Sequence, residues 1–277
     1  MAGSDVADEL GPCYITCMNL GIGRSFFSGA AERPKVDPAV RIYAVGDVHG
    51  RHDLLLSMLG RIADDYESEP DERRCKIVFL GDYIDRGDNS RMVLTSLMRL
   101  MSGAPRGVIA LRGNHEAALL DFIDNPLRNS AWLDFGARQT IADYGVPMPP
   151  RRPSDDDLMG LRDALAVAMG EHLDFLRTLP CHATSGDVVF THAGLAPGDA
   201  DALRNTRAML WGHESSEGDW PAPGKLLVHG HYDAADPVDR PGRICVDTGA
   251  YYSGCLTAVR LDEGVEFLAV TNVGAGR

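Results

Sequence analysis

The chain has 277 residues, of which 44% are hydrophobic and 24% are charged. These proportions are typical of a soluble globular protein with a sizeable core, and they exclude an intrinsically disordered chain. The net charge of -13 repels nucleic acid and anionic membrane surfaces, so we expect neither as a partner. An acidic protein of this kind must bind an anionic substrate through local positive charge, such as metal ions or a few arginines.

The first 38 residues show no sustained hydrophobic period. We interpret residues 1–38 as an N-terminal arm, poorly ordered or packed on the surface, that precedes a domain spanning residues 39–277. The apolar stretch Cys13–Ile22 is too short for a membrane helix and lacks the features of a signal peptide. Six scattered cysteines predict free thiols rather than a disulfide scaffold. These features predict a cytoplasmic protein, and they do not indicate an oligomeric state.

Short apolar runs from Arg41 onward predict the strands of an α/β fold. The runs are rich in β-branched residues, which is typical of buried strands. The first three are separated by His52–Tyr66 and Ser90–Met101, where apolar residues recur at helical spacing, and this order predicts βαβ units. The predicted strands are Arg41–Val45, Lys76–Leu80, Gly107–Leu111, Val188–Thr191 and Leu226–Val228.

Residues 117–180 carry helical patterns and few strand signals. We interpret them as a helical insertion beside the site, interrupted by the proline-rich linker Gly145–Pro153. The tail Arg243–Val270 predicts further strands, with turns at Tyr251–Gly254 and Asp262–Gly264. The predicted helices of the insertion are Ala117–Ile123, Trp132–Tyr144, Leu158–Met169 and His172–Leu179.

Each predicted strand is followed by a cluster of polar residues and glycines. In α/β sheets, ligands collect beyond the carboxyl ends of the strands. Carboxylate, imidazole and amide oxygen are ligand types that suit Mn, Fe and Zn, and glycines let the backbone turn sharply there. One such cluster is weak evidence, but five in order predict a metal site. The clusters are Gly46-Asp47-Val48-His49-Gly50, Gly81-Asp82-Tyr83-Ile84-Asp85-Arg86-Gly87, Arg112-Gly113-Asn114-His115-Glu116, Thr191-His192-Ala193-Gly194 and His229-Gly230-His231.

These five clusters resemble the motifs of the phosphoprotein-phosphatase branch of the calcineurin-like metallophosphoesterases, in particular the bacterial and phage-type Ser/Thr phosphatases. The resemblance runs from about Arg41 to near the C-terminus and spares the N-terminal arm. It implies a two-sheet β-sandwich flanked by helices. It also implies two divalent metal ions at one edge, with manganese as the first expectation and iron or zinc as alternatives.

The resemblance assigns metal-binding roles to specific residues. Asp82 would bridge the two ions. Asp47 and His49 would bind the first ion, and Asn114, His192 and His231 would bind the second. The implied metal ligands are Asp47, His49, Asp82, Asn114, His192 and His231.

The resemblance also implies catalytic and substrate-binding roles. His115 would be the general acid that protonates the leaving group, and Asp85 would orient it. Arg86 and Arg112 would hold the phosphate oxygens beside Asn114, because a guanidinium presents a bidentate fork to phosphate.

Two positions near these motifs leave alternatives open. His229 precedes His231 by two residues and on a strand would face the same side, so it is either a support for the ligands or a packed core histidine. Leu210-Trp211 lacks the arginine that bacterial members often carry shortly afterwards. His213, Arg207 or neither would take that phosphate contact.

The first functional prediction is a Ser/Thr phosphoprotein phosphatase that hydrolyses phosphomonoesters with water activated by the metal ions. Its substrate would be a phosphorylated protein or a small phosphoester. The alternatives are a symmetrical dinucleoside-polyphosphate (diadenosine tetraphosphate) hydrolase and a tyrosine-directed protein phosphatase.

A nucleotide hydrolase needs an aromatic or basic grip on a base. Trp132, Tyr144, Arg151 and Arg152 are candidates for this grip, although the helical spacing of Trp132 and Phe135 is more typical of a core. A non-catalytic binding protein on the same fold ranks below these enzymes, because that class usually lacks ligands or the acid, and here all of them are present.

Overall fold

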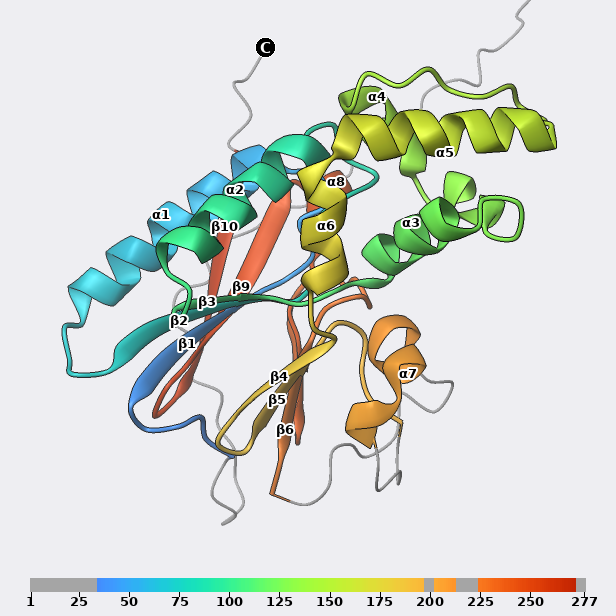
Figure 1. Cartoon of the computed structure of the whole chain (residues 1–277). Coiled ribbons are helices and arrows are strands. Elements are labelled where there is room, and N and C mark those ends of the chain that lie inside the picture. Colours follow the sequence, from blue (N-terminus) through green and yellow to red (C-terminus); the bar gives the residue numbers. More distant parts are fainter. Residues whose placement is uncertain (1–33, 197–201, 213–223, 273–277) are drawn as a thin grey trace, which may run out of the picture.

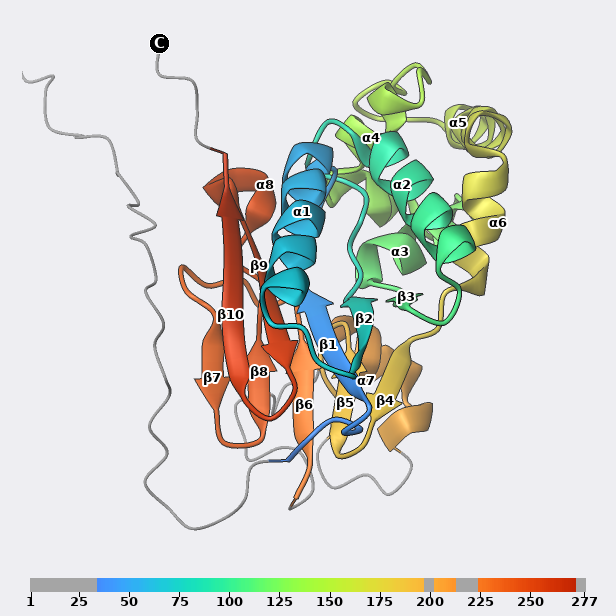
Figure 2. The same cartoon turned by 90° about the vertical axis from the view of Figure 1, so that its left-hand side faces the viewer.

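The computed structural model describes residues 34–196, 202–212 and 224–272. Most of the predicted N-terminal arm, together with Cys13, Cys17 and His213, lies outside the described residues. Within them, two five-stranded sheets pack face to face and helices cover the outer face of one sheet (Figures 1 and 2). This is the α/β sandwich that the resemblance implied.

The first sheet combines three parallel strands with an antiparallel pair. Strands β1, β2 and β3 are parallel because helices α1 (His52–Ser68) and α2 (Ser90–Gly103) provide the crossovers between them. Strand β9 runs antiparallel to both β1 and β10. In spatial order the strands are β10 (Val265–Thr271), β9 (Cys255–Leu261), β1 (Val40–Val45), β2 (Arg74–Phe79) and β3 (Val108–Ala110).

The second sheet also has three parallel strands, β5, β6 and β8, with one antiparallel strand at each edge. The edge strands β4 and β7 were not predicted from the sequence, since both are short and only partly buried. In spatial order the strands are β4 (His182–Ser185), β5 (Val188–Thr191), β6 (Leu226–His229), β8 (Arg243–Cys245) and β7 (Val238–Arg240).

Strand β1 is buried on both faces and connects two layers of the core. Ile42 and Ala44 pack in the cluster between the two sheets, whereas Tyr43 and Val45 pack in the cluster beneath the helices. This alternation follows from the period of two along a strand. Each large apolar side chain buried in this way contributes about 1.5–3 kcal/mol. Helix α7 (Thr206–Trp211) packs on the second sheet through Met209, which shares a cluster with Leu227.

The chain between β3 and β4 forms a block of helices. Its elements are α3 (Asn114–Asp124), the 3-10 helix η1 (Ser130–Asp134), α4 (Ala137–Asp143), α5 (Asp155–Met169) and α6 (Glu171–Thr178). The prediction of one continuous helix over Trp132–Tyr144 is wrong, because Gly136 adopts φ +99° between η1 and α4. The Gly136 carbonyl accepts a hydrogen bond from the Arg86 backbone N–H at 3.0 Å, and a Cβ at Gly136 would contact the Arg86 side chain.

The C-terminal turn and the helix lengths complete the fold. The predicted turn at Tyr251–Gly254 is a single helical turn, α8 (Ala250–Ser253), whereas α1 and α2 lie within two residues of their predicted bounds. In the part of the chain that the structure describes, no helix combines the length and apolar character needed to cross a membrane.

Candidate active site

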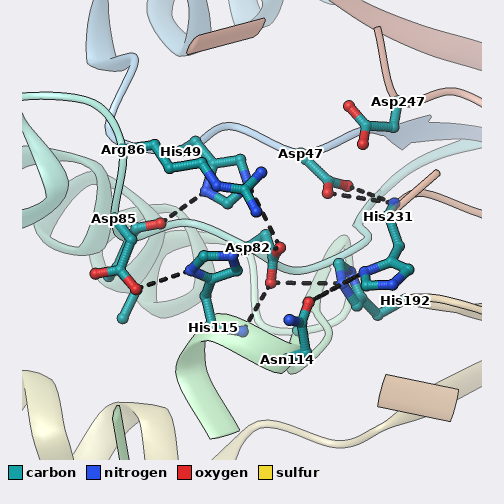
Figure 3. Close-up of polar contacts among 12 residues, drawn as sticks. Asp47, His49, Asp82, Asp85, Arg86, Asn114, His115, His192, His231 and Asp247 are labelled. Carbon is teal, nitrogen blue, oxygen red and sulfur yellow. Dashed lines mark hydrogen bonds and ion pairs between the residues drawn. The ribbon is translucent and has the colours of Figure 1, made fainter. Parts of the chain in front are cut away.

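The carboxyl ends of the parallel strands in both sheets lead to one shared site. Strands β1, β2 and β3 come from the first sheet, and β5, β6 and β8 come from the second. Figure 3 shows Asp82 at the centre, with His49 and His115 on one side and His192 and His231 on the other. Ligand-bearing segments far apart in the chain are therefore brought together.

The backbone is strained where it enters this site. Among the described residues, the non-glycine residues with positive φ are His49, Asp82, Asp85, Arg86 and His231, with φ between 42° and 69°. All five are predicted site residues. Left-handed backbone at such residues costs about 1–3 kcal/mol each. The surrounding fold must stabilise these conformations, and it thereby aims the five side chains.

Glu116 connects two of the loops that carry ligands. Its carboxylate accepts hydrogen bonds from the backbone N–H groups of Asp82 (2.9 Å), Tyr83 (2.7 Å) and Gly113 (2.9 Å). A Cβ at Gly113 would overlap the Asp82 carboxylate, so only glycine fits there. The loop after β2 and the start of α3 are thus held as one unit. The sequence motif contains Glu116, but its structural role was not predicted.

His192, His231 and Asn114 form the first group of converging donor atoms. His192 Nε2 lies 2.8 Å from Asn114 Oδ1 and 3.2 Å from His231 Nδ1, which itself lies 3.1 Å from Asn114 Oδ1. His192 Nδ1 donates to the Leu80 carbonyl at 3.0 Å, which leaves the Nε2 lone pair free for a cation. Burial lowers the pKa of His192 and lowers that of His231 to about 4, so both imidazoles are neutral, as a metal ligand must be.

Asp82 connects this group to a second group of donor atoms, which also contains His49 and His115. Its Oδ1 lies 3.4 Å from His192 Nε2, and its Oδ2 lies 3.4 Å from His49 Nε2. The two oxygens of one carboxylate therefore face two different histidines, which is the geometry of a bridging ligand. Burial opposes ionisation of Asp82, but its interactions with the surrounding histidines and a hydrogen bond from the His115 backbone N–H outweigh it and lower the pKa of Asp82.

His49 is prepared for a cation in the same way as His192. Its Nδ1 donates to the Ile84 carbonyl at 2.8 Å, and burial lowers its pKa to about 3. The Nε2 lone pair accepts a hydrogen bond from Arg86 Nη1 at 3.0 Å. A cation bound to His49 would therefore displace this guanidinium.

Asp47 lies apart from His49 and beside another carboxylate. Its oxygens accept from the His231 backbone N–H at 3.2 and 3.3 Å, and its neighbour is Asp247, which follows β8. Burial, Asp247 and Asp82 raise the pKa of Asp47, and burial raises the pKa of Asp247 to about 6. A cation would relieve this unfavourable pair of buried acids. Asp47 as a ligand of the first ion stays a prediction.

Asp247 was missed in the sequence, although a signal for it exists. The apolar run Ile244–Val246 leads directly into Asp247, and β1 and β2 are likewise followed within three residues by Asp47 and Asp82.

His115 of the second donor group forms a hydrogen-bonded pair with Asp85. His115 Nδ1 lies 2.8 Å from Asp85 Oδ2, and His115 Nε2 faces Asp82 Oδ2 at 3.8 Å. Asp85 also accepts from the Trp132 indole N–H at 2.9 Å and from the Thr140 hydroxyl at 2.6 Å. Burial disfavours the imidazolium, but Asp82 and Asp85 outweigh it and raise the pKa of His115. His115 is therefore suited to carry a proton into the site.

The structure brings one of the two predicted phosphate-binding arginines to the donor groups. Arg86 lies beside His49 and over the Tyr251 ring, with 5.0 Å between its Cζ and the ring centroid. The Nη2 of Arg112 instead donates to the carbonyls of Leu176 (3.2 Å) and Arg177 (2.8 Å) at the end of α6. Phosphate binding by either arginine stays a prediction, and Arg207 is an exposed residue of α7.

His229 is a packed core histidine. It is fully buried, and its Nε2 accepts a hydrogen bond from Arg243 Nε at 2.6 Å. Strand β6 ends at His229 and His231 has φ +68°, so the expectation that both face the same side does not apply.

These groups define a class of protein. Nitrogen and oxygen donors form two groups that share Asp82, one with His49 and His115 and the other with His192 and His231, and Asp85 is hydrogen-bonded to His115. Two divalent cations bound there would supply Lewis acidity and activate a water molecule for attack on phosphorus. The site is therefore that of a metal-dependent phosphoesterase.

Comparison with known proteins agrees with this class. Residues 40–241 match the family model described as calcineurin-like phosphoesterase, and the chain belongs to that family.

Curated relatives of the chain are named as nucleotide hydrolases. It is 30% identical to the symmetrical bis(5'-nucleosyl)-tetraphosphatase of Dechloromonas aromatica (strain RCB), with 80% of this chain and 92% of that protein covered. It is 25% identical to the asymmetrical bis(5'-nucleosyl)-tetraphosphatase PrpE of Halalkalibacterium halodurans, with 82% and 92% covered.

Solved structures with the same fold include protein phosphatases. A cold-active protein-tyrosine phosphatase from a Shewanella species has a TM-score of 0.53 at 18% identity, with 84% of this chain and 83% of that chain covered. A protein serine/threonine phosphatase from Saccharomyces cerevisiae also has a TM-score of 0.53, at 15% identity, with 88% and 86% covered. At these identities the likeness shows the fold alone.

Proposed function

We propose that this metallophosphoesterase hydrolyses dinucleoside polyphosphates, with diadenosine tetraphosphate as the representative substrate. This was the alternative to the Ser/Thr phosphoprotein phosphatase in the sequence analysis. The names of the curated relatives support it, because they are bis(5'-nucleosyl)-tetraphosphatases over about four fifths of this chain. The protein phosphatases named above are structural neighbours below 20% identity.

The arrangement of Asp82 and His115 carries the chemical part of the proposal. Asp82 presents one oxygen to each donor group, and the proton of His115 faces the same space. A polyphosphate with its bridging oxygen near His115 Nε2 would receive that proton as the P–O bond breaks, while water supplies the new oxygen on phosphorus. Asp85 holds the imidazole in the orientation that this transfer needs. Arg86 would bind a non-bridging phosphate oxygen once released from His49.

A direct comparison of substrates tests the proposal. With Mn²⁺, we expect kcat/KM for diadenosine tetraphosphate to exceed that for phosphoserine, phosphothreonine and phosphotyrosine peptides by at least about 10-fold, a difference worth about 1.4 kcal/mol. Chelator should abolish all turnover. The products also identify the bond broken, since ADP alone means symmetrical cleavage and ATP with AMP means asymmetrical cleavage.

Preference for a phosphopeptide would overturn the proposal and favour a protein phosphatase. Metal-loaded protein that turns over none of these substrates would favour a non-catalytic binding protein.

A further inference from the structure

Exposed aromatic side chains gather at the site. Among the described residues, the large hydrophobic side chains that stay exposed include four aromatic ones: Phe135 (39%), Trp211 (37%), Tyr251 (38%) and Tyr252 (54%). The exposed aliphatic ones include Leu56 on α1 and Val167 on α5. An apolar aromatic surface left in water is costly unless a ligand covers it.

These four rings and two site histidines form one continuous row. Successive ring centroids along the row are 6.1, 6.4, 4.7, 5.5 and 4.9 Å apart, and every contact is edge to face. Such spacing is that of packed aromatic pairs. In order, the rings are Trp211, Phe135, His115, His49, Tyr251 and Tyr252.

The row places one aromatic pair on each side of the reacting centre. Trp211 ends α7 and contacts Phe135, which adjoins the acid His115. On the other side, Tyr251 adjoins His49. Helices α7 and α8, which carry these outer rings, lie well apart in both views (Figures 1 and 2). The two pairs are thus separate surfaces joined through the site.

Trp132 and Tyr144, the aromatic residues of the helical insertion that the sequence suggests for base binding, do not supply such surfaces. Trp132 is 1% exposed and donates to Asp85, and Tyr144 is 7% exposed and bonds to His172. Neither ring face is open to a base, so the grip expected from these two residues in the sequence is absent.

We propose that Phe135 with Trp211, and Tyr251 with Tyr252, are two stacking platforms that bind the two nucleobases of one dinucleoside polyphosphate. This inference rests on the proposed function. Any nucleobase can stack on an aromatic ring, whichever base it is. Two bases joined by a flexible polyphosphate match two platforms that flank a phosphate-cleaving centre. The guanidinium of Arg86 over Tyr251 adds a cation next to the inner end of the second platform. A phosphorylated side chain would need neither platform.

The test compares a substrate with bases to one without. The variants Trp211→Ala and Tyr251→Ala are assayed with diadenosine tetraphosphate and with inorganic tripolyphosphate. We expect the ratio of the two kcat/KM values to fall at least about 10-fold in each variant, mainly through KM for the dinucleotide. Trp211→Phe and Tyr251→Phe should restore the ratio, because they keep a ring. Leu56→Ala, an exposed residue on α1, is the matched control and should leave the ratio as in the wild type.

Two results would overturn the platforms. In one, the ratio stays unchanged in both alanine variants. In the other, both substrates decline equally, which means that the rings only support the fold.

A binding measurement separates this inference from the proposed function. Calorimetry with a non-hydrolysable, methylene-bridged diadenosine tetraphosphate measures affinity of the metal-loaded protein without turnover. Wild-type binding that weakens at least about 10-fold in both alanine variants supports the platforms even where the wild type fails to hydrolyse diadenosine tetraphosphate. Wild-type hydrolysis with equal affinity in all variants keeps the function and refutes the platforms. Wild-type protein that neither binds nor hydrolyses refutes both.

Discussion

The two ends of the site differ in how far protein groups alone satisfy their charges. At the end that carries His115, the Asp85 carboxylate has Trp132, Thr140 and His115 as hydrogen-bond partners. At the other end, the buried carboxyl groups of Asp47 and Asp247 lie next to each other. Burial raises the pKa of both, and Asp247 raises the pKa of Asp47 further. Folding alone orients His115, whereas a bound cation would stabilise the ionised forms of the carboxylate pair.

This difference has an energetic basis. A buried carboxylate with several donors is stabilised, while an adjacent like charge penalises both members of a pair. Metal binding should therefore also stabilise the folded state, because the cation relieves a penalty that the unfolded chain does not have. Changing one carboxylate at each end of the site tests this difference.

The largest effect is expected at the carboxylate pair. Asp247→Asn removes a negative charge next to Asp47, so we expect affinity for Mn²⁺ to fall about 10- to 100-fold. The same change should raise the melting temperature of the metal-free protein, because it removes like-charge repulsion. Manganese titration by calorimetry and thermal unfolding in chelator measure the two effects.

Asp163→Asn on the exposed face of α5 is the control for this pair of measurements. Unchanged manganese affinity in Asp247→Asn would show that Asp247 has no part in the cation site, and the contrast between the two ends would fail.

A smaller effect is expected at the end of the site that carries His115 and Asp85. Asp85 favours the protonated form of His115 and so raises its pKa. Activity that needs this proton is present below the pKa of His115 and is lost as pH rises through it. Asp85→Asn lowers that pKa, so the alkaline limb of kcat should move to lower pH by about one unit, the worth of one charge-assisted hydrogen bond.

The pH profile of kcat and the manganese affinity of Asp85→Asn are measured together. An unshifted alkaline limb would show that Asp85 does not set the protonation of His115. A loss of manganese affinity would show that the two ends are not independent.

The sequence predicts the parts of this site that are encoded locally. The strands before Asp47, Asp82 and His192 and the helices α1 and α2 follow from short-range hydrophobic periods, and the resemblance in the motifs anticipates the shared family. Asp82 and His49 are brought together because parallel strands end at one edge of a sheet.

The residues that were missed depend on contacts between distant segments. Thr140 and Trp132 reach Asp85 from 55 and 47 residues away, across a helix break at Gly136 that helical periodicity did not reveal. Arg112 directly precedes the motif residue Gly113, yet its guanidinium donates to carbonyls at the end of α6, which is a tertiary contact that no local pattern encodes. The aromatic row is of the same kind, since its members come from five separate segments of the chain.

The metal content of three proteins tests the central claim most directly. Wild type, Asp82→Asn and His115→Asn are loaded with Mn²⁺, desalted and analysed for metal per chain. We expect about two ions per chain in the wild type and in His115→Asn, although the latter should lose about 10²- to 10⁴-fold in kcat. Asp82→Asn should lose both metal and turnover, because each of its oxygens faces a different donor group. Full metal occupancy in Asp82→Asn, or a wild type that retains no metal, would contradict the shared carboxylate on which the site is built.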